Sequence, residues 1–170
     1  TLNLSGEKKV DVWAARISYV GESGWEIYFN NDKDDGLALY DSLLEVEVVP
    51  VGIETYANSR RLEKCFRLQG ADLETEYNAI EAAIQRPLVK EADFHGKFAH
   101  LAHRKEDPCA ILCTMTLDDL NVSGKTRYPV GISPIIDPAT GEVPIDSKGR
   151  RSYTTGMSYC PSIKKFVVMG

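Results

Sequence analysis

The sequence predicts an α+β fold, with short strands and helices over residues 1–106 and a small antiparallel β-barrel over residues 107–170. Two observations predict it. The first part holds one segment of strand periodicity followed by three segments of helical periodicity. From Cys109 onward, short apolar runs alternate with turns rich in glycine and proline, a spacing typical of a small barrel or sandwich. The domain boundary is therefore expected near Asp107-Pro108.

A β-hairpin is the first predicted element, over residues 9–30. Its first strand alternates Val10, Val12 and Ala14 with Asp11, Trp13 and Ala15. The run Gly21-Glu22-Ser23-Gly24 lies between two runs rich in aromatic and β-branched residues, which is the pattern of a hairpin turn. The turn therefore carries a carboxylate, Glu22.

Three helices are predicted after the hairpin. Either Asp32 or Asp34 is a suitable N-cap for the first helix. We expect the apolar stripe of this helix to face the core; it consists of Leu37, Leu39, Tyr40, Leu43 and Leu44. The second helix covers about residues 53–65 and the third about residues 95–105.

The second helix carries two consecutive arginines. Helical spacing places Ile53, Tyr56, Ala57 and Arg61 near one face. Arg60 points about 100° away from Arg61, because each residue of an α-helix turns by that angle. Only one of the two arginines can therefore share the apolar side of the helix.

The C-terminal strands are predicted at Ala110–Leu117, Ile132–Ile136, Val143–Ile145, Arg151–Thr155 and Lys165–Met169. Cys109 and Cys113 are expected on one face of a strand that begins near Cys109, and we expect both thiols to be buried. The four cysteines contain no CxxC pair, which excludes zinc-ribbon and thioredoxin-like sites and favours a reducing compartment. The three histidines lack a cysteine or carboxylate that would complete a ligand set, so no metal site is predicted.

Composition and net charge limit the classes of partner that this chain is expected to bind. With 43% apolar and 26% charged residues, the chain has the composition of a globular protein. Its net charge of −5 argues against nucleic acid, which binds basic surfaces. No apolar run approaches the roughly 20 residues of a membrane span, so no membrane partner is expected. The chain begins at Thr1 and ends just after the apolar run Phe166–Met169, and we expect a fragment of a longer protein.

Four motifs occur in a fixed order along the chain. They are Ser18-Tyr-Val-Gly-Glu-Ser-Gly-Trp-Glu26, Asn58-Ser-Arg-Arg-Leu-Glu-Lys64, Gly70-Ala-Asp-Leu73 and Asp93-Phe-His-Gly-Lys97. In that order they resemble successive segments of the aminomethyltransferase family. This family includes the glycine-cleavage T-protein and the folate-binding halves of dimethylglycine and sarcosine dehydrogenases. The tail from Arg127 is similar to the C-terminal barrel of the family, so the resemblance covers nearly the whole chain.

The resemblance implies a tetrahydrofolate site in an opening between domains. In the family, the glutamate of Gly-Glu-x-Gly holds the amino-pyrimidine edge of the pterin; here it is Glu22, whose carboxylate can accept two parallel N–H donors. The family's folate-contacting arginine falls on Arg61, whose rigid fork suits a carboxylate or carbonyl group. Tyr19 is an expected stacking or polar neighbour. Taken without the resemblance, these residues are more simply interpreted as a solvated turn carboxylate, a surface arginine and a packed tyrosine.

The implied reaction transfers a one-carbon unit from an amine of the glycine, sarcosine or dimethylglycine type to tetrahydrofolate. The family's catalytic aspartate lies upstream of the segment present here, so we predict no catalytic residue in this chain and no activity of the fragment alone. FAD is expected only in an upstream domain, since the chain contains no G-x-G-x-x-G motif after a strand.

Two other functions stay open: a non-catalytic folate-binding or regulatory module, and a folate-dependent S- or O-demethylase of the same fold. The expected compartment is the bacterial cytoplasm or the mitochondrial matrix. We also expect self-association, because a truncated protein exposes apolar surface that rarely stays solvated.

Overall fold

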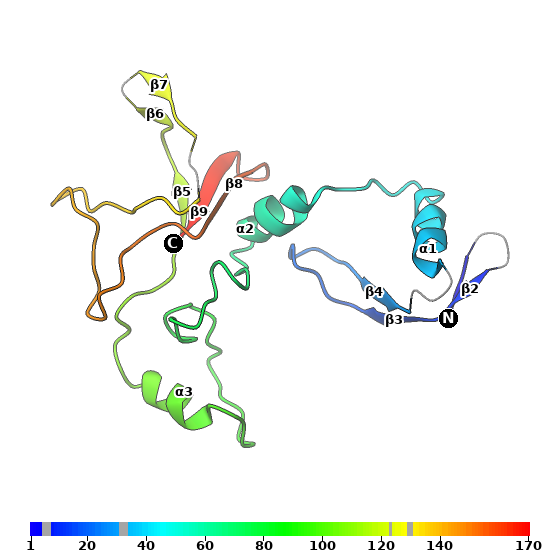
Figure 1. Cartoon of the computed structure of the whole chain (residues 1–170), viewed down its shortest axis with the longest axis horizontal. Helices are drawn as coiled ribbons and strands as arrows, with labels where there is room; N and C mark the ends of the chain where they lie inside the picture. Colours follow the sequence, from blue (N-terminus) through cyan, green and yellow to red (C-terminus); the bar gives the residue numbers. More distant parts are fainter. Residues whose placement is uncertain (5–7, 31–33, 123, 129–130) are drawn as a thin grey trace. The chain divides into compact units, whose positions relative to one another are not determined.

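The structure is a computed structural model of the whole chain (Figure 1), and it describes residues 1–4, 8–30, 34–122, 124–128 and 131–170. By its internal contacts the chain divides into two compact units, Thr1–Ala57 and Asn58–Gly170. The boundary predicted near residue 107 lies inside the second unit and stays a prediction. No helix in the described ranges is long and apolar enough to cross a membrane.

The first unit contains two antiparallel strand pairs. Strand β1 (Leu2–Asn3) pairs with β2 (Lys9–Val10), and β3 (Val12–Ala15) pairs with β4 (Glu26–Phe29). The β3–β4 pair confirms the predicted hairpin. Trp13 lies opposite Tyr28 in its register, and their ring centroids are 4.9 Å apart.

The connection of this hairpin is longer than predicted. The strands stop at Ala15 and start again at Glu26, so residues 16–25 form a loop that includes part of the aromatic and β-branched runs. The chain turns here because the N–H of Ile17 bonds back to the carbonyl of Ala15 at 2.9 Å. The N–H of Val20 then bonds to the hydroxyl of Ser18 at 3.2 Å, in place of a partner strand.

Helix α1 (Asp35–Leu44) follows with Asp34 at its N-cap position, and the expectation of a buried apolar stripe is wrong. Asp34 precedes the helix with a left-handed backbone, φ 54°, and its side chain makes no capping bond. Asp32, the other candidate cap, lies outside the described residues. Of the predicted core-facing stripe only Leu39 is buried, whereas Leu37 is 64% exposed. Hydrophobic periodicity predicted the helix correctly. It did not predict that most of the apolar face would be exposed in the described part of the chain.

The predicted second helix is present in a modified form. Residues Glu54–Arg60 form a π-helix, η2, which continues into the short helix α2 (Arg61–Glu63). As expected, the two arginines point to different sides: Arg61 is buried, and the side chain of Arg60 is 29% exposed. Helix α3 (Lys97–His103) confirms the third predicted helix.

The second unit is organised by a three-stranded antiparallel sheet. Strand β9 (Lys165–Met169) lies between β5 (Thr114–Leu117) and β8 (Gly156–Cys160), as Figure 1 shows. A two-stranded ribbon pairs β6 (Asn121–Val122) with β7 (Lys125–Thr126). Helix α2 packs against the sheet through the buried core. This core consists of Leu62, Cys160, Val167 and Met169, with Leu112 packed against it.

The barrel prediction is borne out only at the level of an α+β fold with small antiparallel sheets. Strand β9 was predicted with its observed bounds, whereas β8 was missed. The strands expected between residues 132 and 155 occur as isolated bridges, Pro134 with Tyr153 and Ile145 with Arg151. Over the described ranges the main sheet is open, so a closed barrel is not confirmed.

The prediction of two buried thiols was wrong. Cys109 and Cys113 are exposed, because β5 begins only at Thr114 and the preceding residues lie outside the sheet. The buried thiol is Cys160, at the end of β8.

Candidate functional site

The loop between β3 and β4 presents the Glu22 carboxylate. Gly21 has φ 66°, a left-handed backbone that glycine adopts without steric cost, and it turns the chain directly before Glu22. Gly24 then passes close to the other side of the loop, since a Cβ added there would lie 3.3 Å from the Cβ of Ser18. The loop is therefore narrow, and the exposed side chain of Glu22 lies between its two glycines.

Tyr19, in the same loop, contacts Tyr56 of η2. The backbone N–H of Tyr19 donates a hydrogen bond to the Tyr56 hydroxyl at 3.2 Å. The two rings also pair, with centroids 6.1 Å apart and planes tilted by 47°. Sequence reasoning placed Tyr56 on a helix face and missed this contact, because nothing local in the sequence signals a bond to a residue 37 positions away.

Arg61 lies deep in the second unit. Its Nη1 donates to the carboxylate of Asp72 and, at 2.9 Å, to the carbonyl of Phe66. Asp72 also accepts the N–H of Leu68 at 2.8 Å and the hydroxyl of Thr155. The guanidinium is thus held in one orientation by several partners.

Gly156 borders this arginine closely. A Cβ at this position would lie 2.9 Å from Nη2 of Arg61, so the guanidinium fills the space that a side chain would need. Of the three predicted site residues, Glu22 and Tyr19 belong to the first unit and share one loop, and Arg61 belongs to the second.

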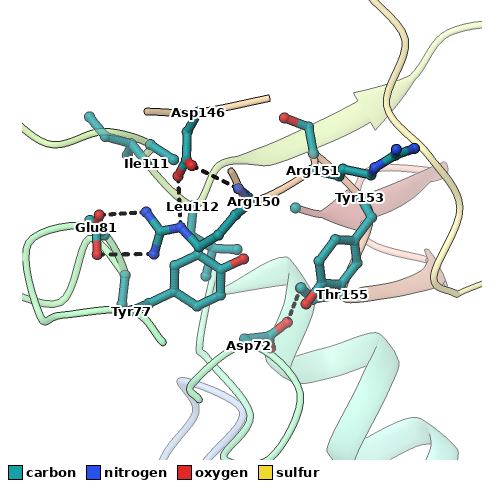
Figure 2. Close-up of a pocket in the computed structure, with 14 residues that line it drawn as sticks. Asp72, Tyr77, Glu81, Ile111, Leu112, Asp146, Arg150, Arg151, Tyr153 and Thr155 are labelled. Atoms are coloured by element: carbon teal, nitrogen blue, oxygen red, sulfur yellow. Dashed lines mark hydrogen bonds and ion pairs between the residues drawn. The ribbon is translucent and has the colours of Figure 1, made fainter. Parts of the chain in front are cut away.

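A second cluster of charges surrounds Arg150, and sequence reasoning did not assign it (Figure 2). Arg150 pairs with Glu81, at 2.6 Å from Nη2 to Oε1, and with Asp146, at 2.7 Å from Nε to Oδ2. Its guanidinium lies over the ring of Tyr77, 4.6 Å from the centroid, and Lys148 reaches Glu81 at 2.9 Å. The hydrogen bonds from Arg150 lower the pKa of Glu81 to about 2, although burial opposes this shift.

A small cavity lies beside this cluster. It is lined in part by Tyr77, Leu112, Tyr153 and Thr155 and encloses about 60 Å³. That is space for a few water molecules and far too little for a pterin with its side chain. Burial raises the pKa of Tyr77 to about 12, so its phenol stays protonated at neutral pH. We therefore assign the Arg150 cluster a structural role, in which it ties residues 77–81 to the turn at 146–150.

No metal site accompanies these features in the part of the chain that the structure describes. There, no three His, Cys, Asp or Glu side chains come together in a group that could hold a metal ion.

Comparison with known proteins shows which family this chain resembles. The model of the GCVT N-terminal domain family matches residues 6–91. Human mitochondrial dimethylglycine dehydrogenase is 37% identical over 123 residues, which are 68% of this chain and 14% of that protein. The aminomethyltransferase of Thermosipho melanesiensis is 35% identical over 85 residues, 50% of this chain and 23% of that protein. The aminomethyltransferase of Koribacter versatilis is 31% identical over 163 residues, 91% and 38% of the two chains. The chain thus spans well under half the length of each of these relatives.

Proposed function

Because this chain belongs to the GCVT N-terminal domain family, we propose that it is the tetrahydrofolate-binding portion of an aminomethyltransferase-like protein. The reaction of the whole protein transfers a one-carbon unit from an amine of the glycine, sarcosine or dimethylglycine type to tetrahydrofolate. The observation that carries the proposal is the Glu22 carboxylate, presented between Gly21 and Gly24 by a narrow loop.

The chemistry of this loop suits the pterin ring. Its amino-pyrimidine edge carries two parallel N–H donors, and one carboxylate can accept both in a bidentate, charge-assisted pair. The ring of Tyr19, three residues before Glu22 and half-buried, supplies a flat face on which a heterocycle can stack. Together these groups recognise both the edge and the plane of the ligand.

Arg61 enters the proposal as a preoriented guanidinium. Its bonds to Asp72 and Phe66 fix the direction of its fork. We propose that this fork contacts the folate in the intact protein, which requires the guanidinium, whose side chain is 1% exposed in this chain, to become accessible there. Orientation in advance lowers the entropic cost of binding.

We assign the chain binding and positioning, and no step of the proton or iminium chemistry. Holding the acceptor in place is itself a large part of catalysis for a transfer between two bound groups. In a parent of the dehydrogenase type, FAD would be held by a domain outside this chain. We further propose that residues 107–170 close into a barrel in the intact protein, which would work in the bacterial cytoplasm or the mitochondrial matrix.

Calorimetric titration of the chain with reduced tetrahydrofolate tests the proposal. We expect binding by the wild type and at least a tenfold weaker affinity for Glu22→Gln, since hydrogen bonds to a charged group contribute about 1.5–3 kcal/mol. Glu142→Gln, which changes an exposed turn carboxylate in the second unit, is the matched control and should bind like the wild type. Absence of binding by the folded wild type, or equal binding by Glu22→Gln, would overturn the proposal.

A further inference from the structure

We infer that Tyr56 is a positioning residue of the folate site, which holds the loop carrying Glu22 and Tyr19 in its binding conformation. The inference rests on the proposed function and goes beyond it, because the motifs that indicate the site do not include Tyr56. Its basis is the hydrogen bond from the N–H of Tyr19 to the Tyr56 hydroxyl, together with the pairing of the two rings.

The contact with Tyr56 differs in range from two hydrogen bonds inside the loop. The β3–β4 ladder ends at Ala15 and Glu26. Between them, Ile17 bonds to Ala15 and Val20 bonds to Ser18, each only two residues away. Such local bonds shape a turn without fixing where it points. The bond to Tyr56 reaches 37 residues along the chain and ties the loop to another element of the first unit.

The π-helical form of η2 is the second observation. Residues Glu54–Arg60 adopt this wider winding, which is rare and occurs frequently at functional sites. A π-helical turn changes the direction of every side chain on it relative to an α-helix. Tyr56 lies inside this segment, so its direction toward Tyr19 depends on that winding.

The chemical consequence is a loop ordered before the ligand arrives. The Tyr56 hydroxyl fixes the backbone at Tyr19, and Glu22 follows three residues later across Gly21, whose φ of 66° allows the turn. The ring of Tyr56 also backs the ring of Tyr19 at a separation within the usual range for aromatic pairs. Binding then loses less conformational entropy than it would with a mobile loop.

The test uses Tyr56→Phe, which keeps the ring and removes only the hydroxyl, in the full chain. Tyr40→Phe, an exposed tyrosine on α1 of the same unit, is the matched control. Without ligand, we expect the Tyr19 amide proton to exchange faster in Tyr56→Phe, measured by NMR. With tetrahydrofolate, we expect an affinity about three- to tenfold weaker than for the wild type, the size of one net hydrogen bond.

A double-mutant cycle separates positioning from general stability. If Tyr56 acts through the loop, Tyr56→Phe should weaken binding much less in the Glu22→Gln background than in the wild type. Three outcomes would each overturn the inference: wild-type affinity in Tyr56→Phe, additive effects in the cycle, or unchanged exchange of the Tyr19 amide. If Glu22→Gln still weakens binding in these cases, the proposed function holds without the inference. If the wild type fails to bind tetrahydrofolate, the proposed function and the inference both fail, and the exchange data then show only whether the contact exists.

Discussion

Arg61 and Asp72 form an ion pair that is almost fully withdrawn from solvent, with side-chain exposures of 1% and 0%. The Asp72 carboxylate binds two side chains, because its second oxygen accepts a hydrogen bond from the hydroxyl of Thr155. Thr155 directly precedes the first residue of β8. The pair thus joins α2 to the chain entering the central sheet. This explains why a residue expected at a ligand is also part of the core.

Asp72→Ala should therefore destabilise the second unit strongly. Removing one partner of a buried pair leaves an uncompensated charge, at a cost of about 3–5 kcal/mol. Urea unfolding followed by circular dichroism measures this loss. Lys165→Gln is the control, since it breaks the exposed pair between Lys165 and Asp118 and should cost less than about 1 kcal/mol. Similar losses for the two variants would show that the Arg61 pair is not a structural tie.

The pairing of Glu81 predicts a pH dependence. Its pKa falls from an ordinary value of 4.5 to about 2 in the folded chain. A carboxyl with a lowered folded pKa stabilises the protein fully above its unfolded pKa, and this contribution disappears as the pH falls through the folded pKa. The contribution, roughly 3 kcal/mol at pH 7, should be lost between about pH 4.5 and pH 2.

Glu81→Gln provides the comparison, because glutamine resembles the protonated carboxyl. The difference in unfolding free energy between the wild type and this variant should be largest at neutral pH and should approach zero near pH 2. A difference that stays constant over this range would show that Arg150 does not stabilise the ionised form of Glu81.

The four cysteines should differ sharply in reactivity. Burial raises the pKa of Cys160 from 9.0 to about 11, and its side chain is 0% exposed. At pH 8 the other three thiols, which are exposed, should react with Ellman's reagent in the native chain, and Cys160 only after unfolding. Cys160→Ser should remove the slow thiol, whereas Cys109→Ser should remove a fast one. Four equally fast thiols would contradict the burial of Cys160.

The exposed apolar side of α1 supports the proposal that copies of this chain associate. Leu37 and Tyr40 are 64% and 50% exposed, and Val49 beyond the helix is 83% exposed. We propose that a second copy of this chain covers these side chains, because large exposed apolar patches rarely stay solvated. Sedimentation velocity at micromolar concentration should show dimers or larger species, and Leu37→Glu should reduce them. Asp41→Asn on the same helix is the control, and a monodisperse wild-type monomer would contradict the proposal.

Elements of the fold set by interactions between neighbouring residues were predictable from the sequence, whereas those set by contacts between distant residues were not. The hairpin was predicted from the period-two pattern of its first strand, and β9 from a short continuous apolar run, Phe166–Met169. Strand β8 was missed because Gly156 and the polar Ser158 interrupt that pattern. The loop of Glu22 was recognised by its glycines, but its length was underestimated, because a side chain, Ser18, replaced the expected partner strand.

By itself, the sequence determined the elements whose causes are local. The glycines of the Glu22 loop, the separation of Arg60 from Arg61 and the order of the four motifs are properties of neighbouring residues, governed by backbone sterics and periodicity. Only the tertiary structure decided which side chains meet: Tyr19 with Tyr56, Arg61 with Asp72, and Glu81 with Arg150, which are 37, 11 and 69 residues apart. The physical reason is that such contacts depend on how elements pack, whereas local periodicity specifies only which face of an element is apolar.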